Sequence, residues 1–259
     1  MLKPKVCVLR SAGTNCDNET ASAFLLAGAD IKLVHINSLV SKEIILNDFH
    51  ILALPGGFSY GDDVASGRIL ANELRFKLVE DLRRFINAGK LIIGICNGFQ
   101  ILVKSGLLPG GIDLKQNTSL ITNDSGKFED RWVYLRSVGR CIWTKNLKQI
   151  IHLPVAHGEG KFITQDKDTL KNLKINKQIV FQYSDLDGEL SGYPDNPNGS
   201  LENIAGITDL TGRILGLMPH PERHIFSVQH PRWTAELASR HGDGLQIFKN
   251  GVDFIKENF

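Results

Sequence analysis

The chain has 259 residues, of which 42% are hydrophobic and 22% charged, and its formal net charge is +2. This length is enough for one large α/β domain or two small ones with a substantial core. The near-neutral charge gives no case for binding to nucleic acid or to a membrane surface. No apolar run approaches the roughly 20 residues of a membrane-spanning helix.

The N-terminal segment does not resemble a secretory signal, because its apolar stretch is short and soon followed by polar residues. We therefore expect a cytoplasmic protein. The four cysteines are Cys7, Cys16, Cys96 and Cys141. They are scattered and form no C-x-x-C pair, which predicts free thiols and neither a disulfide framework nor a metal site.

Short β-branched runs alternate with helical periodicity in the first half of the chain. The predicted strands are 6–9, 31–35, 51–54 and 91–95, and the predicted helices are 17–27 and 70–88. Residues 91–95 carry too little polarity for an exposed face, which is typical of a central strand in a helix-covered parallel sheet. The βαβα order predicts an α/β fold with an open, doubly wound, mostly parallel sheet.

The second half is less regular and favours an antiparallel extension of that sheet. The candidate strands are 132–135, 141–143 and 179–183, followed by a turn-rich loop at 191–200 and a hairpin formed by 204–208 and 214–218. Residues 245–259 have the spacing of an amphipathic helix. No internal repeat or linker is visible, so we predict a single domain over residues 1–259.

Cys96 is flanked by Gly94 and Gly98, between a predicted strand and a predicted helix. The pattern G-x-C-x-G is typical of a nucleophile elbow, in which the glycines leave room for a sharp turn. A thiolate there would be favoured by the N-terminus of the helix. The backbone N–H of Asn97 would then face a developing oxyanion. The alternative is an inert core cysteine, because free cysteines are commonly buried.

A nucleophile of this kind needs a base, and the segment after predicted strand 214–218 offers one. Prolines in Met-Pro-His-Pro-Glu favour an extended chain, in which His220 and Glu222 point the same way. The alternative is a surface turn. Pro-Gly-Gly follows strand 51–54, and the carboxyl ends of parallel strands gather at one edge. Gly57 could supply a second N–H to an oxyanion there, unless this segment is only a turn.

Three motifs together resemble the class I, triad-type glutamine amidotransferases. They are PGG at 55–57, G-x-C-x-G-x-Q at 94–100 and H-P-E at 220–222. Further segments resemble the glutaminase subunits of phosphoribosylformylglycinamidine synthase: GTNCDNETA at 13–21, GGFSYGDDVASGRI at 56–69, PVAHGEGKF at 154–162 and MPHPER at 218–223. The resemblance covers nearly the whole chain and implies a flavodoxin-like glutamine amidotransferase fold.

The sequence departs from this family at three places. Ala12 stands where proline is expected, which should matter little. Residues 138–150 and 224–244 are longer than in the short bacterial subunit. Contacts specific to these two insertions are therefore not given by the resemblance.

The resemblance implies that the protein hydrolyses glutamine to glutamate and ammonia. Cys96 would attack the side-chain amide, while the backbone N–H groups of Gly57 and Asn97 hold the oxyanion. His220, oriented by Glu222, would protonate the leaving ammonia and then activate the water that hydrolyses the glutamyl thioester.

The resemblance also implies partners. The ammonia would pass to a PurL-type synthetase, with a small PurS-type subunit in multi-subunit systems. That synthetase would use ATP and Mg²⁺ to convert formylglycinamide ribonucleotide to its amidine in purine biosynthesis. This chain has no ATP-grasping motif, so we expect no cofactor in it.

Secondary site residues follow from the same resemblance. The expected glutamine-binding residues are Phe58, Gln100, Phe128 and Arg131. The residues expected at the mouth of the site or at the partner interface are His157, Tyr60, Asp62 and Asp63. For each of them, core packing or a solvent-exposed loop is the alternative.

Two other classes of function stay open on the sequence alone. A cysteine-elbow peptidase or small-molecule hydrolase would share the elbow, but would lack H-P-E after a late strand together with PGG. A non-catalytic scaffold would bind only glutamine or the partner. The complete set of Cys96, His220 and Glu222 argues against that scaffold.

Overall fold

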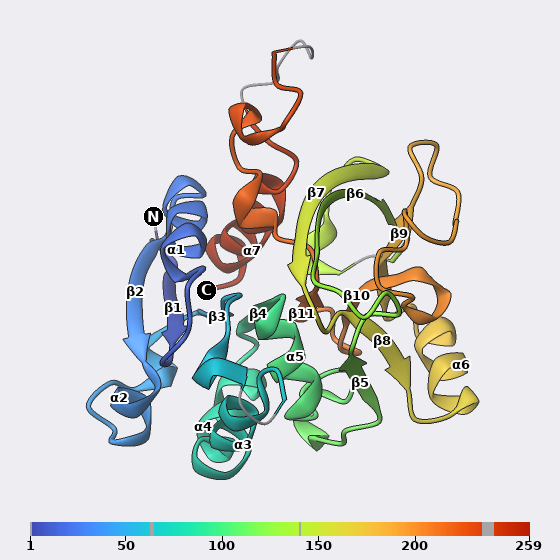
Figure 1. Cartoon of the computed structure of the whole chain (residues 1–259). Helices are drawn as coiled ribbons and strands as arrows, with labels where there is room; N and C mark the ends of the chain where they lie inside the picture. Colours follow the sequence, from blue (N-terminus) through green and yellow to red (C-terminus); the bar gives the residue numbers. More distant parts are fainter. Residues whose placement is uncertain (1, 63–64, 140, 235–240) are drawn as a thin grey trace.

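The computed structural model describes residues 2–62, 65–139, 141–234 and 241–259. Nine of its strands form one sheet: β1 Lys5–Arg10, β2 Asp30–His35, β3 Ile51–Leu54, β4 Leu91–Ile95, β6 Glu129–Ser137, β7 Ile150–His157, β9 Ile179–Ser184, β10 Ile204–Thr208 and β11 Ile214–Leu217. Their order is β2-β1-β3-β4-β11-β10-β9-β6-β7 (Figure 1). Two further strands, β5 Thr118–Ile121 and β8 Lys161–Thr164, pair separately.

The sheet has a parallel half and an antiparallel half. Strands β2, β1, β3, β4 and β11 pair in parallel, whereas β10, β9, β6 and β7 continue the sheet with antiparallel pairs. Every residue of β4 is buried, as expected for a strand covered on both faces. The predicted mostly parallel sheet with an antiparallel extension is confirmed.

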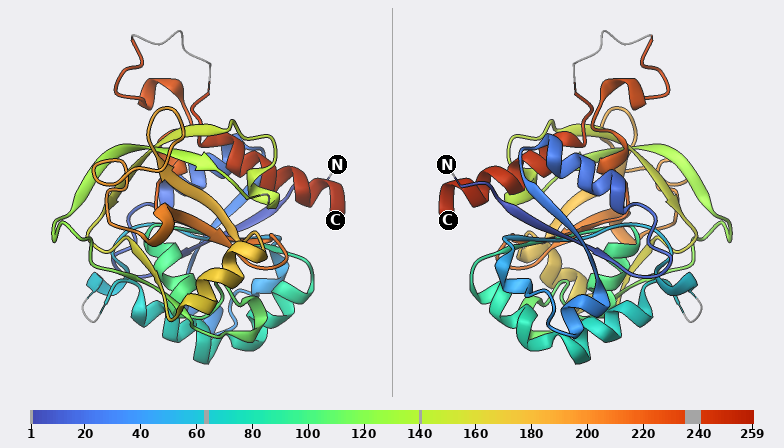
Figure 2. Two further views of the ribbon diagram at one scale, coloured as in Figure 1. Left: turned by 90° about the vertical axis from the view of Figure 1, so that its right-hand side faces the viewer. Right: turned by 90° about the vertical axis from the view of Figure 1, so that its left-hand side faces the viewer.

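The parallel half lies between two layers of helices (Figure 2). The helices are α1 Asp17–Leu26, α2 Ile36–Val40, α3 Arg68–Lys77, α4 Val79–Asn87, α5 Asn97–Lys104, α6 Lys167–Ile175 and α7 Leu245–Asn258. Helices α1 and α7 share one face, where the rings of Phe24 and Phe248 meet edge to face at 5.0 Å. Helices α3, α4 and α5 cover the other face.

Two predicted elements are wrong. The single helix expected at 70–88 is two helices that meet at Leu78. Leu74, Leu78 and Leu82 are all buried, so the apolar spacing runs through the kink. The strand expected at 141–143 is a short 3-10 helix, η4 Ile142–Thr144. It buries Trp143 completely, and the indole N–H donates to the carbonyl oxygen of Arg213 (3.0 Å).

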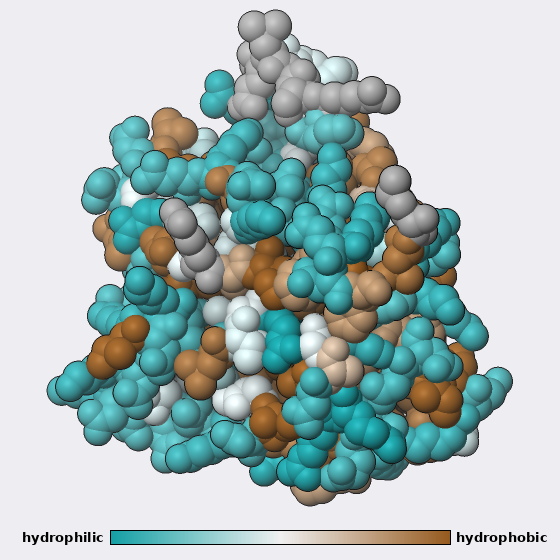
Figure 3. All heavy atoms as spheres, turned by 180° about the vertical axis from the view of Figure 1, so that it is seen from behind, coloured by the Kyte–Doolittle hydropathy of each residue, from teal (hydrophilic) through white to brown (hydrophobic). Residues whose placement is uncertain are grey.

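Hydrophilic side chains predominate on the face shown in Figure 3, and hydrophobic ones form small, separate groups there. Residues 225–234, which include the 3-10 helix η7 Ser227–Gln229, extend away from the sheet in the red segment at the top of Figure 1. Across the described ranges no helix is long and apolar enough to cross a membrane. That the whole chain forms one domain stays a prediction.

Candidate active site

Three neighbouring parallel strands end at the same edge of the sheet, and each leads into one predicted part of the site. Strand β3 runs into Gly57, β4 into Cys96, and β11 into the segment that carries His220. Strand β4 pairs with both of the others. A pocket of about 440 Å³ lies here and is lined by all three residues. The parallel order therefore brings together segments that are far apart in the sequence.

Cys96 occupies a strained turn between β4 and α5. Its φ of 51° and ψ of −106° lie outside the regions that a residue with a side chain normally adopts. The two glycines allow this turn. A Cβ on Gly94 would lie 2.5 Å from the carbonyl oxygen of Gly98, and a Cβ on Gly98 only 1.9 Å from that of Leu54. The elbow is fixed to β11, because the N–H of Cys96 donates to Leu217 (2.8 Å).

The sulfur of Cys96 lies at the positive end of the α5 helix dipole. Only 5% of the residue is exposed, and its Sγ is 3.7 Å from the carbonyl oxygen of Ala156 on β7. The first backbone N–H groups of a helix point out of its end, and that of Asn97 is the first of α5. The nucleophile predicted from the sequence thus borders the pocket beside such a group.

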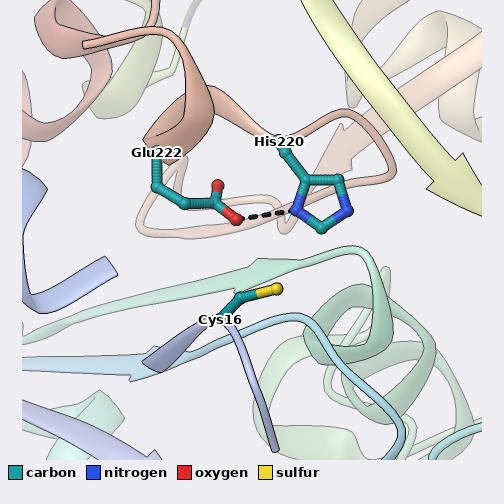
Figure 4. Close-up of side chains that lie close together, drawn as sticks. All are labelled: Cys16, His220 and Glu222. Atoms are coloured by element: carbon teal, nitrogen blue, oxygen red, sulfur yellow. Dashed lines mark hydrogen bonds and ion pairs between the residues drawn. The ribbon is translucent and has the colours of Figure 1, made fainter. Parts of the chain in front are cut away.

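His220 and Glu222 form a buried pair (Figure 4). The imidazole Nδ1 is 2.7 Å from Oε1 of Glu222, and each residue is 1% exposed. The two side chains meet through a 3-10 turn, η6 Pro221–Arg223, and not through the extended chain that the sequence predicts. The N–H of His220 also donates to the carbonyl oxygen of Pro154 (2.8 Å).

The environment of His220 favours its protonated form. Burial lowers the pKa of the imidazole, but the carboxylate of Glu222 and the interaction with Cys96 outweigh it and hold that pKa well above its ordinary value. Because the carboxylate accepts from Nδ1, the exchangeable proton belongs to Nε2. This nitrogen is buried, and the imidazole also interacts with the sulfurs of Cys16 and Cys96. His220 lines the pocket, so it can act on a substrate bound there.

A second thiol, Cys16, lies beside the same pair (Figure 4). It is a site residue that was not predicted from the sequence. Arg223 donates to its Sγ at 3.2 Å, and burial raises the pKa of the thiol. Gly56 makes the close packing possible, because a Cβ there would lie 2.8 Å from Cε1 of His220 and 3.2 Å from this Sγ. The signal in the sequence was the cysteine of GTNCD, which follows β1 at the same edge of the sheet.

The side-chain ligand atoms of Cys16, His220 and Glu222 all lie within 4.8 Å of one another. These are residue types that bind zinc, so by type and spacing the group could hold a metal ion. The Nδ1 of the histidine is already engaged by the carboxylate. The expectation that the chain holds no metal stays a prediction.

The loop after β3 carries Gly57, whose φ is 128°. Only glycine fits there, since a Cβ would lie 2.7 Å from the backbone nitrogen of Asn15. The neighbouring N–H of Phe58 donates to the carbonyl oxygen of Gly13 (3.0 Å). The loop between β1 and α1 therefore supports one side of the loop that carries Gly57.

Two of the predicted glutamine-binding residues, Phe128 just before β6 and Arg131 within it, differ in where their side chains lie. Phe128 and Asp130 line the pocket, whereas Arg131 does not. Successive side chains of a strand point to opposite faces. The guanidinium of Arg131 is instead bonded to Glu129 (2.5 Å) and to the hydroxyl of Tyr193 (2.7 Å). Arg131 therefore faces away from the pocket, and glutamine binding by this segment stays a prediction.

Phe58 and Gln100 line the pocket as predicted. Phe58 is 46% exposed, so its ring is accessible. The amide of Gln100 is already engaged, because its nitrogen donates to the carbonyl oxygen of Glu159 (2.6 Å) and its oxygen accepts from Asn97 (2.9 Å). In this structure Gln100 links the elbow helix to the turn after β7.

His157 also lines the pocket, but it does not lie at an outer surface. Its Nδ1 donates to Oδ1 of Asn123 (3.2 Å), an oxygen that also accepts from the N–H of Gly160. Its Nε2 accepts from Asn198 (3.4 Å). Burial lowers the pKa of His157 to about 3. The imidazole is therefore a neutral, fixed part of the pocket wall, and a role at the mouth of the site or at the partner interface stays a prediction.

The remaining predicted residues lie on the loop after Phe58. The hydroxyl of Tyr60 donates to Glu73 on α3 (2.6 Å), which holds the ring against that helix. Asp62 is the last residue of the 3-10 helix η2 Ser59–Asp62. Asp63 lies outside the described residues. A role for them at the mouth of the site or in docking stays a prediction.

Several lining residues were not predicted from the sequence. They are Asn15, Cys16, Ser66, Asp130, Ala156, Gly158, Glu159 and Arg223. All of them except Asp130 lie inside the quoted motifs, and three of those, Ala156, Gly158 and Arg223, are next to a residue that was predicted.

The fold of the chain is that of a known family. The model of the CobB/CobQ-like glutamine amidotransferase domain matches residues 3–255. A glutamine amidotransferase structure from Thermotoga maritima shares the fold, with a TM-score of 0.59 at 15% identity over all of both chains. The class of the protein is therefore a glutamine amidotransferase.

Similar proteins identify one family within the glutamine amidotransferases. The phosphoribosylformylglycinamidine synthase subunit PurQ of Dehalococcoides mccartyi is 51% identical, over 99% of this chain and all of its own length. The subunit of the same name from Methanococcus maripaludis is 46% identical, over 98% of each chain. The structure of PurLQS from Thermotoga maritima matches with a TM-score of 0.75 at 31% identity, over 98% of this chain and all of that chain. The chain belongs to the PurQ family of glutamine amidotransferases.

Proposed function

We propose that this chain is the glutaminase subunit of a phosphoribosylformylglycinamidine synthase. The observation that carries the proposal is the position of Cys96 and of the His220–Glu222 pair at the ends of two adjacent parallel strands, around one pocket. Relatives that match nearly the full chain are named as that subunit.

The reaction follows from the chemistry of these groups. The sulfur of Cys96 attacks the side-chain amide carbon of glutamine, and the carbonyl oxygen becomes an oxyanion held by the N–H groups of Gly57 and Asn97. The imidazolium of His220 gives its Nε2 proton to the leaving nitrogen, which departs as ammonia. The neutral imidazole then takes a proton from water, whose oxygen attacks the thioester carbon. The tetrahedral intermediate expels the sulfur as a thiolate beside the imidazolium, and glutamate leaves.

The ammonia needs an acceptor on another chain. The similar Thermotoga structure is of PurLQS, and we infer that this chain likewise assembles with PurL-type and PurS-type subunits. The PurL-type subunit would use ATP and Mg²⁺ to convert formylglycinamide ribonucleotide to its amidine with this ammonia. We also infer a cytoplasmic location, in keeping with four cysteines that are all unpaired.

Turnover of glutamine tests the proposal. We expect weak release of glutamate by the chain alone and a marked increase with the PurL-type and PurS-type subunits and their substrates. A variant Cys96→Ala should bind the partners and release no glutamate. Equal turnover with and without partners would contradict the expected stimulation by the partners, and unchanged activity of Cys96→Ala would contradict the mechanism.

Covalent labelling tests the alternative that the protein is a cysteine-elbow peptidase. A glutamine-analogue electrophile should label Cys96 in the assembled complex, as seen by mass spectrometry of the peptides. Labelling elsewhere, or hydrolysis of peptides in place of glutamine, would favour the peptidase. The non-catalytic scaffold predicts no covalent label on Cys96 at all.

A further inference from the structure

The two backbone donors of the proposed oxyanion hole come from different segments. Gly57 belongs to the loop after β3, and Asn97 begins α5. Such donors act only when both lie about 2.7–3.1 Å from the position of the oxyanion. Their relative position must therefore be fixed to a few tenths of an ångström.

The loop that carries Gly57 has little regular structure to hold it. Gly57, Tyr60 and Gly61 all have positive φ. On one side the loop is bonded to the β1–α1 loop, because the N–H groups of Phe58 and Tyr60 donate to Gly13 (3.0 Å) and Ala12 (2.6 Å). These bonds do not connect it to the helix that carries the other donor.

The side chain of Asn97 makes that connection. Its Oδ1 accepts from the hydroxyl of Ser59 at 2.5 Å and from the backbone N–H of Ser59 at 3.3 Å. Its Nδ2 donates to Gln100 at 2.9 Å. Because the oxygen has two donors and the nitrogen an acceptor, the orientation of the amide is fixed. Ser59, Asn97 and Gln100 are all at least 95% buried, so water competes little for these bonds.

We propose that the side chain of Asn97 is a positioning group for the oxyanion hole. Its backbone N–H is one donor, while its side-chain oxygen anchors Ser59, two residues after the other donor. The bond that Asn97 donates to Gln100 keeps the amide turned towards Ser59, and Gln100 in turn donates to the carbonyl oxygen of Glu159. This inference rests on the proposed function and assigns the side chain a role separate from the backbone N–H.

Substitutions can separate the two roles, since every residue except proline keeps the backbone N–H. Asn97→Ala removes both bonds to Ser59, Ser59→Ala removes only the hydroxyl bond, and Ser59→Thr keeps a hydroxyl. The matched control is Ser105→Ala, which removes a buried hydroxyl that bonds to Leu102 at the end of the same helix, outside the pocket.

The variants are assayed as complexes with the PurL-type and PurS-type subunits. We expect Asn97→Ala to lower kcat by about 10- to 100-fold, somewhat less than the loss of an oxyanion donor itself, with KM for glutamine within about threefold. Ser59→Ala should lower kcat less, Ser59→Thr should recover most of that loss of kcat, and Ser105→Ala should have the kcat of the wild type. The double variant with Asn97→Ala and Ser59→Ala should have a kcat no lower than that of Asn97→Ala alone, because both substitutions break the same connection.

A second readout separates positioning from an effect on the thiol. Alkylation of Cys96 by iodoacetamide occurs at a saturated carbon and forms no oxyanion. Its rate, followed on the Cys96 peptide, should stay within about twofold of the wild type in every variant. If Asn97→Ala does not fold, the pair Ser59→Ala and Ser59→Thr carries the test.

The outcomes are distinct. If alkylation falls as much as kcat, or if kcat is unchanged in folded variants, the positioning role is wrong. An active wild type with equally active variants overturns this inference alone. A wild-type complex without glutaminase activity overturns the proposed function and this inference with it.

Discussion

Nδ1 of His220 lies 2.7 Å from Oε1 of Glu222, and the pair is almost completely buried. The carboxylate fixes which nitrogen carries the exchangeable proton and contributes to the raised pKa of the imidazole. We therefore expect Glu222→Gln to lower kcat/KM by about 10³-fold or more, the scale on which an orienting carboxylate matters in such triads.

The same substitution gives a pH test with a defined sign. A raised pKa keeps His220 protonated above its ordinary range, and the proton donor is lost as pH rises through that pKa. Without the negative charge of Glu222 the pKa of the imidazole falls, so the alkaline limb of the kcat/KM profile should move to lower pH. An alkaline limb that stays in place in Glu222→Gln would assign this limb to another group.

Two thiols border one pocket, but only Cys96 occupies the elbow at the start of α5. Burial raises the pKa of Cys16, and Arg223 engages its sulfur. We expect Cys96→Ser to lower kcat by more than about 10³-fold, as removal of a nucleophile does. The matched variant Cys16→Ser should keep at least about a third of the wild-type kcat. A glutamine-analogue electrophile should label Cys96 alone. Label on Cys16 would show that the nucleophile is misassigned.

The parts of the fold that follow from local patterns were predictable. Residues 51–54 and 91–95 match β3 and β4, because central parallel strands are short, wholly apolar runs. Gly89, with a φ of 79°, ends α4 as its position predicts. The kink at Leu78 was not predictable, since that residue continues the apolar spacing of both helices. The strand predicted at 141–143 was wrong because one large buried side chain, that of Trp143, gives a short segment the apolar pattern of a strand.

The site was predictable to the level of its segments and less so to the level of single side chains. Cys96 and His220 meet because the strand order places β4 beside β11, and their motifs follow these strands. The sequence could not show that Cys16 lies beneath His220, because that contact joins the end of β1 to the segment after β11. Nor could it show that Arg131 faces away from the pocket, because one residue of register decides the face.

Acid should destabilise this protein in part through His157. Its pKa is lowered to about 3 in the folded chain by burial, against an ordinary value of 6.5. Between these pH values the unfolded chain binds the proton and the folded chain does not, so stability falls as pH falls, by about 1.4 kcal/mol per pH unit. The free energy of unfolding, measured with urea between pH 4.5 and 6, should change less steeply with pH for His157→Gln than for the wild type. An identical pH dependence of the two would contradict the neutral, buried imidazole.

The elbow glycines can be tested through stability, independently of any activity. A Cβ on Gly98 would lie 1.9 Å from the carbonyl oxygen of Leu54, and both groups belong to the backbone of packed elements. Neither can move without shifting α5 against β3, so Gly98→Ala should cost about 3 kcal/mol or prevent folding. The matched control is Gly192→Ala, on an exposed loop where a Cβ meets nothing within 4 Å. Its free energy of unfolding should stay within about 0.5 kcal/mol of the wild type. Equal stability of the two variants in urea unfolding would mean that the strand-to-helix turn tolerates a side chain at Gly98, and the steric reason for the G-x-C-x-G pattern would fail with it.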